Sequence, residues 1–210
     1  ALIMVHGDES GLIMPPNVAP YQAVIVPIWR GGDEQTQVND CALDVQRRLS
    51  DKFRVHYDGR DEYKPGFKFS EWELRGVPLR VEIGPRDMAA GQLTLVRRDT
   101  REKSQAPIEG AVQAVGDLLR DIQLDLLARA REFQHENTVT ANSFGELQEA
   151  IGERKFVWAD WCGRAQCELE VKAKTAATIR NIPFERELRP GSCVNCGQAS
   201  DGLVIFARSY

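Results

Sequence analysis

The 210 residues are enough for one large domain or two small ones, each with its own core. A hydrophobic content of 42% and a charged content of 28% are ordinary for a soluble globular protein, and no run of about 18 apolar residues could span a bilayer. The net charge of −4 hides a basic segment, because residues 52–103 hold 12 Lys+Arg against 9 Asp+Glu; this permits a nucleic-acid-binding face without assigning one.

Residues 1–20 are expected to form two short extended runs and a linker. The run 1–6 reads as a strand, 11–14 is a second apolar run, and the two prolines that follow it end regular pairing. No basic segment precedes the first apolar residues, so a secretory signal peptide is not expected. A chain that begins within a strand suggests that residues 1–20 are the remnant of a larger preceding domain.

From residue 21 the pattern changes to alternating strands and helices. The run 23–28 is apolar throughout, which is typical of a strand buried on both faces. Further strands are expected at 53–57, 78–83 and 92–97, with helices at 35–51 and 69–74 and a long helix from Pro107 to about residue 137. This alternation predicts an α/β domain over 21–137, with a small mixed, mostly parallel sheet and helices on its faces.

The remaining residues, 138–210, are expected to form a second, small α+β domain. Ser143 with Glu146 three residues later has the pattern of a helix-capping box. The run 156–158 reads as a strand, 168–177 as a helix, 179–184 as an extended segment and 203–206 as a closing strand.

Four cysteines in this second domain have the spacing of a metal site. They form a C-x4-C pair and a C-x2-C pair, and Gly191 and Gly197 flank the second pair: Cys162, Cys167, Cys193 and Cys196. Zn²⁺ prefers four thiolates in a tetrahedron, so the pattern predicts a structural zinc site. Because sulfur would fill all four positions, we assign the metal no hydrolytic role.

Two other interpretations of the cysteines stay open. They could form a pair of disulfides, or Cys193 and Cys196 could be a redox pair with unrelated cysteines nearby. The fifth cysteine, Cys41, lies in a helical pattern and is expected to be a packed core thiol. Cysteines with the spacing of metal ligands are more typical of proteins in the reducing cytoplasm than of exported proteins.

Two longer stretches carry a family resemblance. Residues 4–22 read MVHGDESGLIMPPNVAPYQ, and residues 64–87 read KPGFKFSEWELRGVPLRVEIGPRD. Both resemble prolyl-tRNA synthetase, a class II aminoacyl-tRNA synthetase. The four-cysteine tail and the terminal residues 207–210 resemble the C-terminal zinc domain of its archaeal/eukaryotic-like branch, so the resemblance covers essentially the whole chain.

The resemblance implies the class II anticodon-binding fold for 21–137 and a zinc-binding domain for 138–210. A parent enzyme of this family would attach proline to tRNA(Pro) with ATP and Mg²⁺, and would be a cytoplasmic homodimer. The class II catalytic motifs are not found in these residues, so the stretch alone is expected not to aminoacylate. Tyr210 would bring its carboxylate toward the catalytic domain.

Four residues align with the family's anticodon contacts: Phe69, Glu73, Arg80 and Arg86. The proline anticodon ends in two guanines, whose O6 and N7 accept hydrogen bonds while N1–H and N2–H donate them. Arginine can serve the acceptors, a carboxylate the donors, and an aromatic ring can stack on a base. The simpler interpretation is a surface ion pair between Glu73 and Arg80, with Phe69 in the core.

Charged residues close to these four in sequence are weaker candidates. Lys64, Lys68 and Arg75 would neighbour backbone phosphates. The nearby carboxylates Asp58, Asp61 and Glu62 are expected to be solvated. Two other function classes stay open: a stand-alone zinc-stabilised interaction protein that does not read tRNA, and a thiol redox protein.

Overall fold

A computed structural model describes residues 2–185 and 190–209. The chain divides into two compact units, Ala1–Ala128 and Arg129–Tyr210. Helix α5 (Ala111–Glu136) begins in the first unit and ends in the second. The division therefore falls within this helix, whereas the expected domain boundary after residue 137 coincides with its end. Tyr210 lies outside the described residues.

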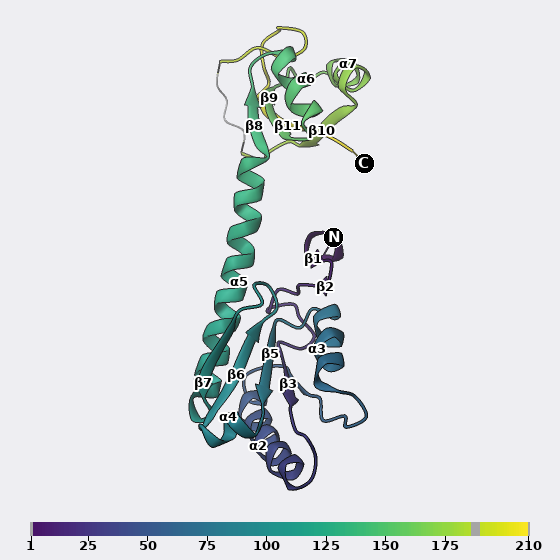
Figure 1. Ribbon diagram of the computed structural model, residues 1–210. Helices are drawn as coiled ribbons and strands as arrows, with labels where there is room; N and C mark the ends of the chain where they lie inside the picture. The colour runs from purple at the N-terminus through teal and green to yellow at the C-terminus, as the bar shows by residue number, and fades with distance from the viewer. Residues whose placement is uncertain (1, 186–189, 210) are drawn as a thin grey trace. The chain divides into compact units, whose positions relative to one another are not determined.

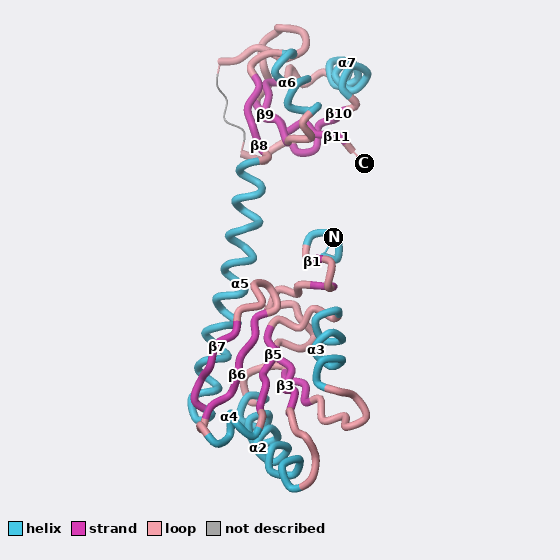
Figure 2. The backbone as a smooth tube through the Cα atoms, viewed as in Figure 1, coloured by secondary structure: helices cyan, strands magenta, loops and turns pink. Residues whose placement is uncertain are grey.

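The first unit is built on a five-stranded mixed sheet with the order β4-β3-β5-β6-β7 (Figures 1 and 2). Its strands are β3 (Ala23–Pro27), β4 (Val55–Tyr57), β5 (Leu79–Ile83), β6 (Gln92–Arg97) and β7 (Lys103–Pro107). Strand β3 pairs in parallel with β4 and β5, whereas β6 and β7 pair antiparallel. The predicted mixed α/β sheet is confirmed, with parallel pairing confined to β4-β3-β5. The segments between β5, β6 and β7 are shorter than the dozen or so residues that a parallel crossover needs.

Helices cover both faces of this sheet. They are α2 (Asp33–Ser50), α3 (Pro65–Leu74), α4 (Pro85–Ala89), the 3-10 turn η1 (Ile108–Gly110) and α5. The predicted apolar stripe of α2 packs with α5 on one face in the main core, where the buried α2 residues are Val38, Ala42, Val45 and Leu49. Helix α3 packs on the opposite face, in a small cluster of Val24, Val26, Trp72 and Val77.

The alternation of side chains along β5 places its charged residues on the α3 face. Leu79, Val81 and Ile83 enter the main core, so Arg80 and Glu82 point to the other side. The strand register sets Arg80 between Val24 of β3 and Val96 of β6. The pattern of residues 78–83 predicted this polar face.

The first residues differ from the expectation. Instead of a strand over 1–6, Leu2–Val5 forms the short helix α1, followed by a hairpin of β1 (Gly7–Asp8) and β2 (Gly11–Leu12). An extended apolar run needs a neighbouring strand, and within the described part of the chain β1 and β2 pair as a strand ladder only with each other. It lies against the end of α3, where Gly11 meets Leu74.

The second unit holds a four-stranded sheet with the order β10-β11-β9-β8. Its elements are β8 (Thr138–Ala141), α6 (Phe144–Gly152), β9 (Phe156–Asp160), α7 (Ala165–Thr175), β10 (Ala177–Asn181) and β11 (Leu203–Arg208). Its core contains Leu147, Ile151, Val157, Val204 and Phe206. Half of the predicted capping box is present: Ser143 Oγ accepts a hydrogen bond from Glu146 N at 3.2 Å, whereas the Glu146 carboxylate accepts from Asn142 N at 2.8 Å. Within the described residues, no helix is both long and apolar enough to cross a membrane.

Candidate nucleic-acid interface and metal centre

Three of the four predicted anticodon residues form one cluster. Phe69 and Glu73 lie one turn apart on α3, and Arg80 reaches them from β5. Arg80 Nη1 donates to Glu73 Oε1 at 2.8 Å, and Arg80 Nε donates to Glu82 Oε1 at 2.9 Å. The guanidinium carbon of Arg80 lies 4.0 Å from the centroid of the Phe69 ring. The fold therefore places the predicted aromatic ring, carboxylate and arginine in contact with one another.

Burial within the cluster is uneven. Arg80 is 9% exposed, whereas the Glu73 side chain is 32% exposed. A buried guanidinium needs partners, and Arg80 has two carboxylates. The ion pair of the simpler interpretation is thus present. Phe69, however, is only half-buried at the edge of the small α3 cluster and lies over Arg80, so it does not fill the main core.

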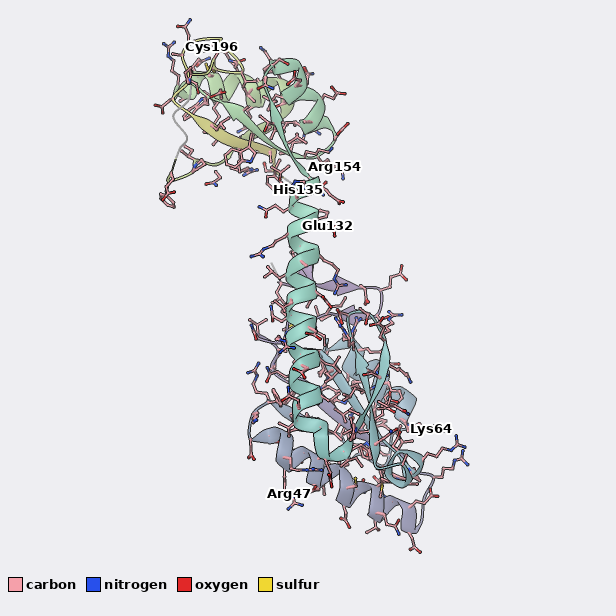
Figure 3. All side chains as sticks on the ribbon, turned by 90° about the vertical axis from the view of Figure 1, so that its left-hand side faces the viewer. Arg47, Lys64, Glu132, His135, Arg154 and Cys196 are labelled. Atoms are coloured by element: carbon pink, nitrogen blue, oxygen red, sulfur yellow. The ribbon has the colours of Figure 1, made fainter. Side chains whose placement is uncertain are left out.

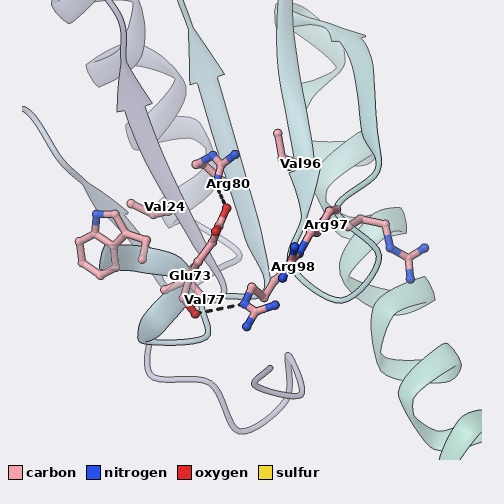
Figure 4. A pocket seen from close by; sticks show the side chains of 9 residues that line it. Val24, Glu73, Val77, Arg80, Val96, Arg97 and Arg98 are labelled. Carbon is pink, nitrogen blue, oxygen red and sulfur yellow. Dashed lines mark hydrogen bonds and ion pairs between the residues drawn. The ribbon is translucent and has the colours of Figure 1, made fainter. Parts of the chain in front are cut away.

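A shallow depression adjoins the cluster on the side of β6 (Figure 4). Its volume is about 10 Å³, and its charged lining includes Glu73, Arg80, Arg97 and Arg98. A space of this size holds about one water molecule and no nucleobase. A base at this site would therefore lie over the cluster, against Phe69 and the exposed part of Glu73.

Arg86 lies apart from the other three. It is an exposed residue of α4, and it lines a hollow of about 350 Å³ together with Trp29, Arg30 and Gly84. This hollow is at the carboxyl ends of the parallel strands β3 and β5, where open α/β sheets commonly bind ligands. Sequence reasoning missed Trp29 and Arg30, although their position directly after the buried run 23–28 was a usable signal.

The three residues proposed as phosphate neighbours, which lie in α3 or at its ends, have different environments. Lys64 is exposed at the start of α3 (Figure 3). Arg75 donates to Glu71 Oε1 at 2.6 Å and lies over the Trp72 ring. Lys68 is 1% exposed, and its ammonium donates to the main-chain oxygen of Asp58 at 3.2 Å. The prediction for Lys68 is wrong, because its side chain is buried and its ammonium lies over the Trp29 ring, 5.1 Å from the centroid, where it is not accessible to a phosphate.

Asp58 is likewise buried, contrary to the expectation of a solvated carboxylate. Its two oxygens accept hydrogen bonds from Arg60 at 2.8 and 2.7 Å and from Trp72 Nε1 at 2.8 Å. Burial alone would raise the pKa of Asp58, but these hydrogen bonds outweigh it and hold the pKa at about 2. Arg60 also binds Glu71 of α3 at 2.6 Å, so this network fixes the loop to the helix that carries Phe69 and Glu73.

The four predicted metal ligands come together in the second unit. Cys162 follows β9, Cys167 is in the first turn of α7, and Cys193 and Cys196 lie in the loop before β11. Their sulfur atoms all lie within 4.8 Å of one another. Cys162 and Cys167 are 3.4 Å apart, and Cys162 and Cys196 are 3.7 Å apart. A tetrahedron with zinc–sulfur bonds of about 2.3 Å has edges of about 3.8 Å, so the four residues fit a metal ion.

The loop around the second cysteine pair is shaped for such a site. Gly197 N donates to Cys193 O at 2.9 Å, and Gly197 has a φ of +70°, a region that favours glycine. Burial raises the pKa of Cys167 to about 12, whereas a backbone hydrogen bond at Gln198 lowers the pKa of exposed Cys196 to about 7. All four thiols are free of disulfides. The described residues thus place four sulfurs where one metal ion could be held.

Comparison with known proteins gives two matches to family models. Residues 22–118 match the model described as anticodon binding domain, and residues 144–210 match the model described as prolyl-tRNA synthetase, C-terminal. The mixed sheet with its charged α3 face is therefore an anticodon-binding domain of the class II type.

Curated relatives agree with these matches over the whole chain. A protein named proline–tRNA ligase from Alkaliphilus oremlandii is 45% identical over 210 residues, covering 100% of this chain and 43% of the relative. Its counterpart from Natranaerobius thermophilus is 47% identical over 213 residues, covering 100% of this chain and 44% of the relative. The chain belongs to the prolyl-tRNA synthetase family, and it spans less than half the length of the curated relatives it matches.

Proposed function

We propose that this chain recognises the anticodon of tRNA(Pro) as the tRNA-binding part of a proline–tRNA ligase. The observation that carries the proposal is the contact of Phe69, Glu73 and Arg80 within the region that matches an anticodon-binding domain. Family membership supports tRNA as the ligand, and the side chains of the cluster are of the types that recognise a base.

The Glu73–Arg80 pair is complementary to one edge of guanine. It presents an acceptor and a donor 2.8 Å apart, and the base offers two donors, N1–H and N2–H, beside the acceptor O6. The exposed part of Glu73 would accept from the donors, while Arg80 turns one N–H toward O6. Adenine presents a donor and an acceptor in the reverse order, so its N6–H would face the Arg80 donor and its N1 the Glu73 acceptor, and neither hydrogen bond to the base could form.

The Phe69 ring would fix the plane of the bound base by stacking. Base–aromatic stacking is worth about 1–3 kcal/mol and does not depend on base identity. Arg86 acts from the second hollow, where Trp29 and Arg30 offer a further ring and a further positive charge to an adjacent nucleotide. Exposed Lys64 would neighbour the RNA backbone.

A binding experiment with two tRNAs and one variant tests this proposal. We expect Arg80→Ala to weaken binding of tRNA(Pro) by about 1–3 kcal/mol and to relax discrimination against tRNA whose anticodon guanines are replaced by adenines. Lys52→Ala, in the exposed turn after α2, is the control for loss of one positive charge. Equal affinity of the wild-type chain for both tRNAs would instead favour a zinc-stabilised interaction protein that does not read the anticodon.

The remaining assignments accompany this proposal. The four-cysteine site holds a structural Zn²⁺, which would cross-link the end of β9, α7 and the loop before β11. It would have no hydrolytic role. Residues 21–137 are the anticodon-binding domain and 138–210 the zinc-binding domain. The whole ligase would be a cytoplasmic homodimer that uses ATP and Mg²⁺ outside these residues.

A further inference from the structure

A second arginine contacts Glu73 from beneath the cluster. Arg98 follows β6 directly, its side chain is 2% exposed, and its Nε donates to the main-chain oxygen of Glu73 at 3.1 Å (Figure 4). The remaining two nitrogens bind both oxygens of Asp8, at 2.9 and 2.6 Å. Arg98 therefore joins the β1–β2 hairpin to the last turn of α3, across 90 residues of sequence.

The hairpin and the end of α3 also fit closely against each other. A Cβ atom on Gly11 would lie 2.4 Å from Leu74 Cα, and one on Gly76 would lie 2.5 Å from Leu12 Cβ. Met14 N donates to Gly76 O at 3.1 Å. Most atoms of this contact are backbone atoms, so the last turn of α3 has little freedom to move independently of the hairpin.

We propose that Arg98, held by Asp8, is a positioning residue that sets the carboxylate of Glu73 for guanine recognition. This inference rests on the proposed function. Arg80 holds the Glu73 side chain from one direction, while Arg98 holds its main chain from another, so the two contacts fix both ends of the residue. The hairpin of residues 7–12 thereby contributes to base recognition, because it carries the Asp8 that holds Arg98.

The electrostatics explain why Asp8 is the residue that matters. Its hydrogen bond with Arg98 holds the pKa of Asp8 well below the usual range, so Asp8 is charged throughout neutral pH. Without that charge, the buried guanidinium of Arg98 would lack its strongest partner. Glu73 of α3 lines the same depression as Arg98, so its carboxylate is a candidate replacement partner. Arg98 would then compete with the base for the atoms that read it.

Asp8→Asn tests the inference against a matched control. We compare the full chain, Asp8→Asn and Asp125→Asn for binding to tRNA(Pro) and to the same tRNA with its anticodon guanines replaced by adenines. Asp125 pairs with Arg97 at 2.6 Å, so its variant removes a neighbouring ion pair of the same kind but leaves Arg98 intact. We expect Asp8→Asn to lower the discrimination ratio about three- to thirtyfold and Asp125→Asn to leave it unchanged.

The ratio separates positioning from mere stabilisation, because a general loss of stability would weaken binding of both tRNAs alike. If the wild-type chain discriminates and Asp8→Asn retains the full ratio, the inference is overturned. If the wild-type chain shows no discrimination, the proposed function fails instead, and the inference about guanine fails with it.

Hydrogen exchange without RNA distinguishes these failures further. The amide of Gly76 donates to Glu73 O at 3.0 Å, the same oxygen that Arg98 binds. We expect Asp8→Asn to accelerate exchange at residues 74–77 while exchange in α2 stays at the wild-type rate. Unchanged exchange at 74–77 would show that Arg98 does not hold the end of α3. Arg98→Lys, which keeps the charge but loses the bidentate geometry, should show the same local acceleration.

Discussion

The guanidinium of Arg80 lies 4.0 Å from the ring centroid of Phe69, between that ring and the sheet from which Arg80 projects. One side chain is thus stacked and paired at the same time, because its nitrogens also bind Glu73 and Glu82. Such a guanidinium is held in place before any ligand arrives. Its side chain therefore loses little conformational entropy when a ligand binds.

Phe69→Leu should weaken tRNA(Pro) binding by about 1–3 kcal/mol through loss of base stacking, with little change in discrimination between guanine and adenine. Phe67→Leu is the control, since Phe67 is 53% exposed on the same helix and stacks on Tyr63 instead. Fluorescence titration of both variants measures the effect. An equal loss in the two variants would show that Phe69 has no special place in recognition.

The proposed zinc site predicts one ion per chain in the wild type and a small fraction of that in Cys193→Ser, because three thiolates and one hydroxyl bind zinc more weakly. Chelation of the wild-type chain should unfold the second unit while the first retains its structure. Cys41→Ser, outside the cluster, should keep its zinc. Native mass spectrometry reads the metal, and full zinc retention by Cys193→Ser would contradict the site.

Asp58 should make the first unit sensitive to acid. Its pKa of about 2 in the folded chain lies below the usual unfolded value of about 3.9, so the ionised form stabilises the fold by about 2 kcal/mol above pH 4. That contribution is lost as the pH falls from 4 through 2. Asp58→Asn should lower the unfolding free energy by about 2 kcal/mol at pH 7, and by less near pH 2.

Urea denaturation at several pH values checks this dependence. Asp61→Asn, an exposed carboxylate three residues away, should have almost no effect at any pH. If the two variants lost the same free energy at pH 7, the hydrogen bonds of Asp58 to Arg60 and Trp72 would not stabilise the fold.

Gly11→Ala should destabilise the first unit by steric conflict. Gly11 has a φ of +131° and its missing Cβ would lie 2.4 Å from the backbone of Leu74. Gly31→Ala is a close control, because its φ of +125° is similar while nothing lies within 4 Å of the position of its added Cβ. We expect Gly11→Ala to cost about 1–3 kcal/mol more than Gly31→Ala in thermal unfolding. Equal costs would mean that only the backbone conformation matters.

Much of the fold could be predicted because periodicity reports burial directly. The apolar stripe of α2 and the alternation in β5 were visible in the sequence, and both define the main core. Strand β7 was not predicted, since its residues Lys103–Pro107 are mostly polar and exposed and only the pairing with β6 makes them extended. The run 1–6 was wrongly predicted as a strand for the opposite reason: its residues are apolar, but no neighbouring strand pairs with Leu2–Val5, which is helical.

The candidate site was predicted as residue types but not as an arrangement. Spacing on α3 placed Phe69 beside Glu73, and the polar side of β5 oriented Arg80. Nothing local indicated that Arg86 would line a separate hollow, or that Lys68 would be buried. Those facts depend on contacts between distant segments, as does the link from Asp8 to Arg98.

The most direct test replaces one anticodon guanine at a time by inosine, which lacks only the N2 amino group. If Glu73 accepts a hydrogen bond from that group, inosine at one of the two positions should weaken binding of the wild-type chain by about 1 kcal/mol or more. The same replacement should cost almost nothing in Glu73→Ala, because the acceptor is already absent. An equal penalty in both proteins, at each position, would contradict guanine recognition by Glu73.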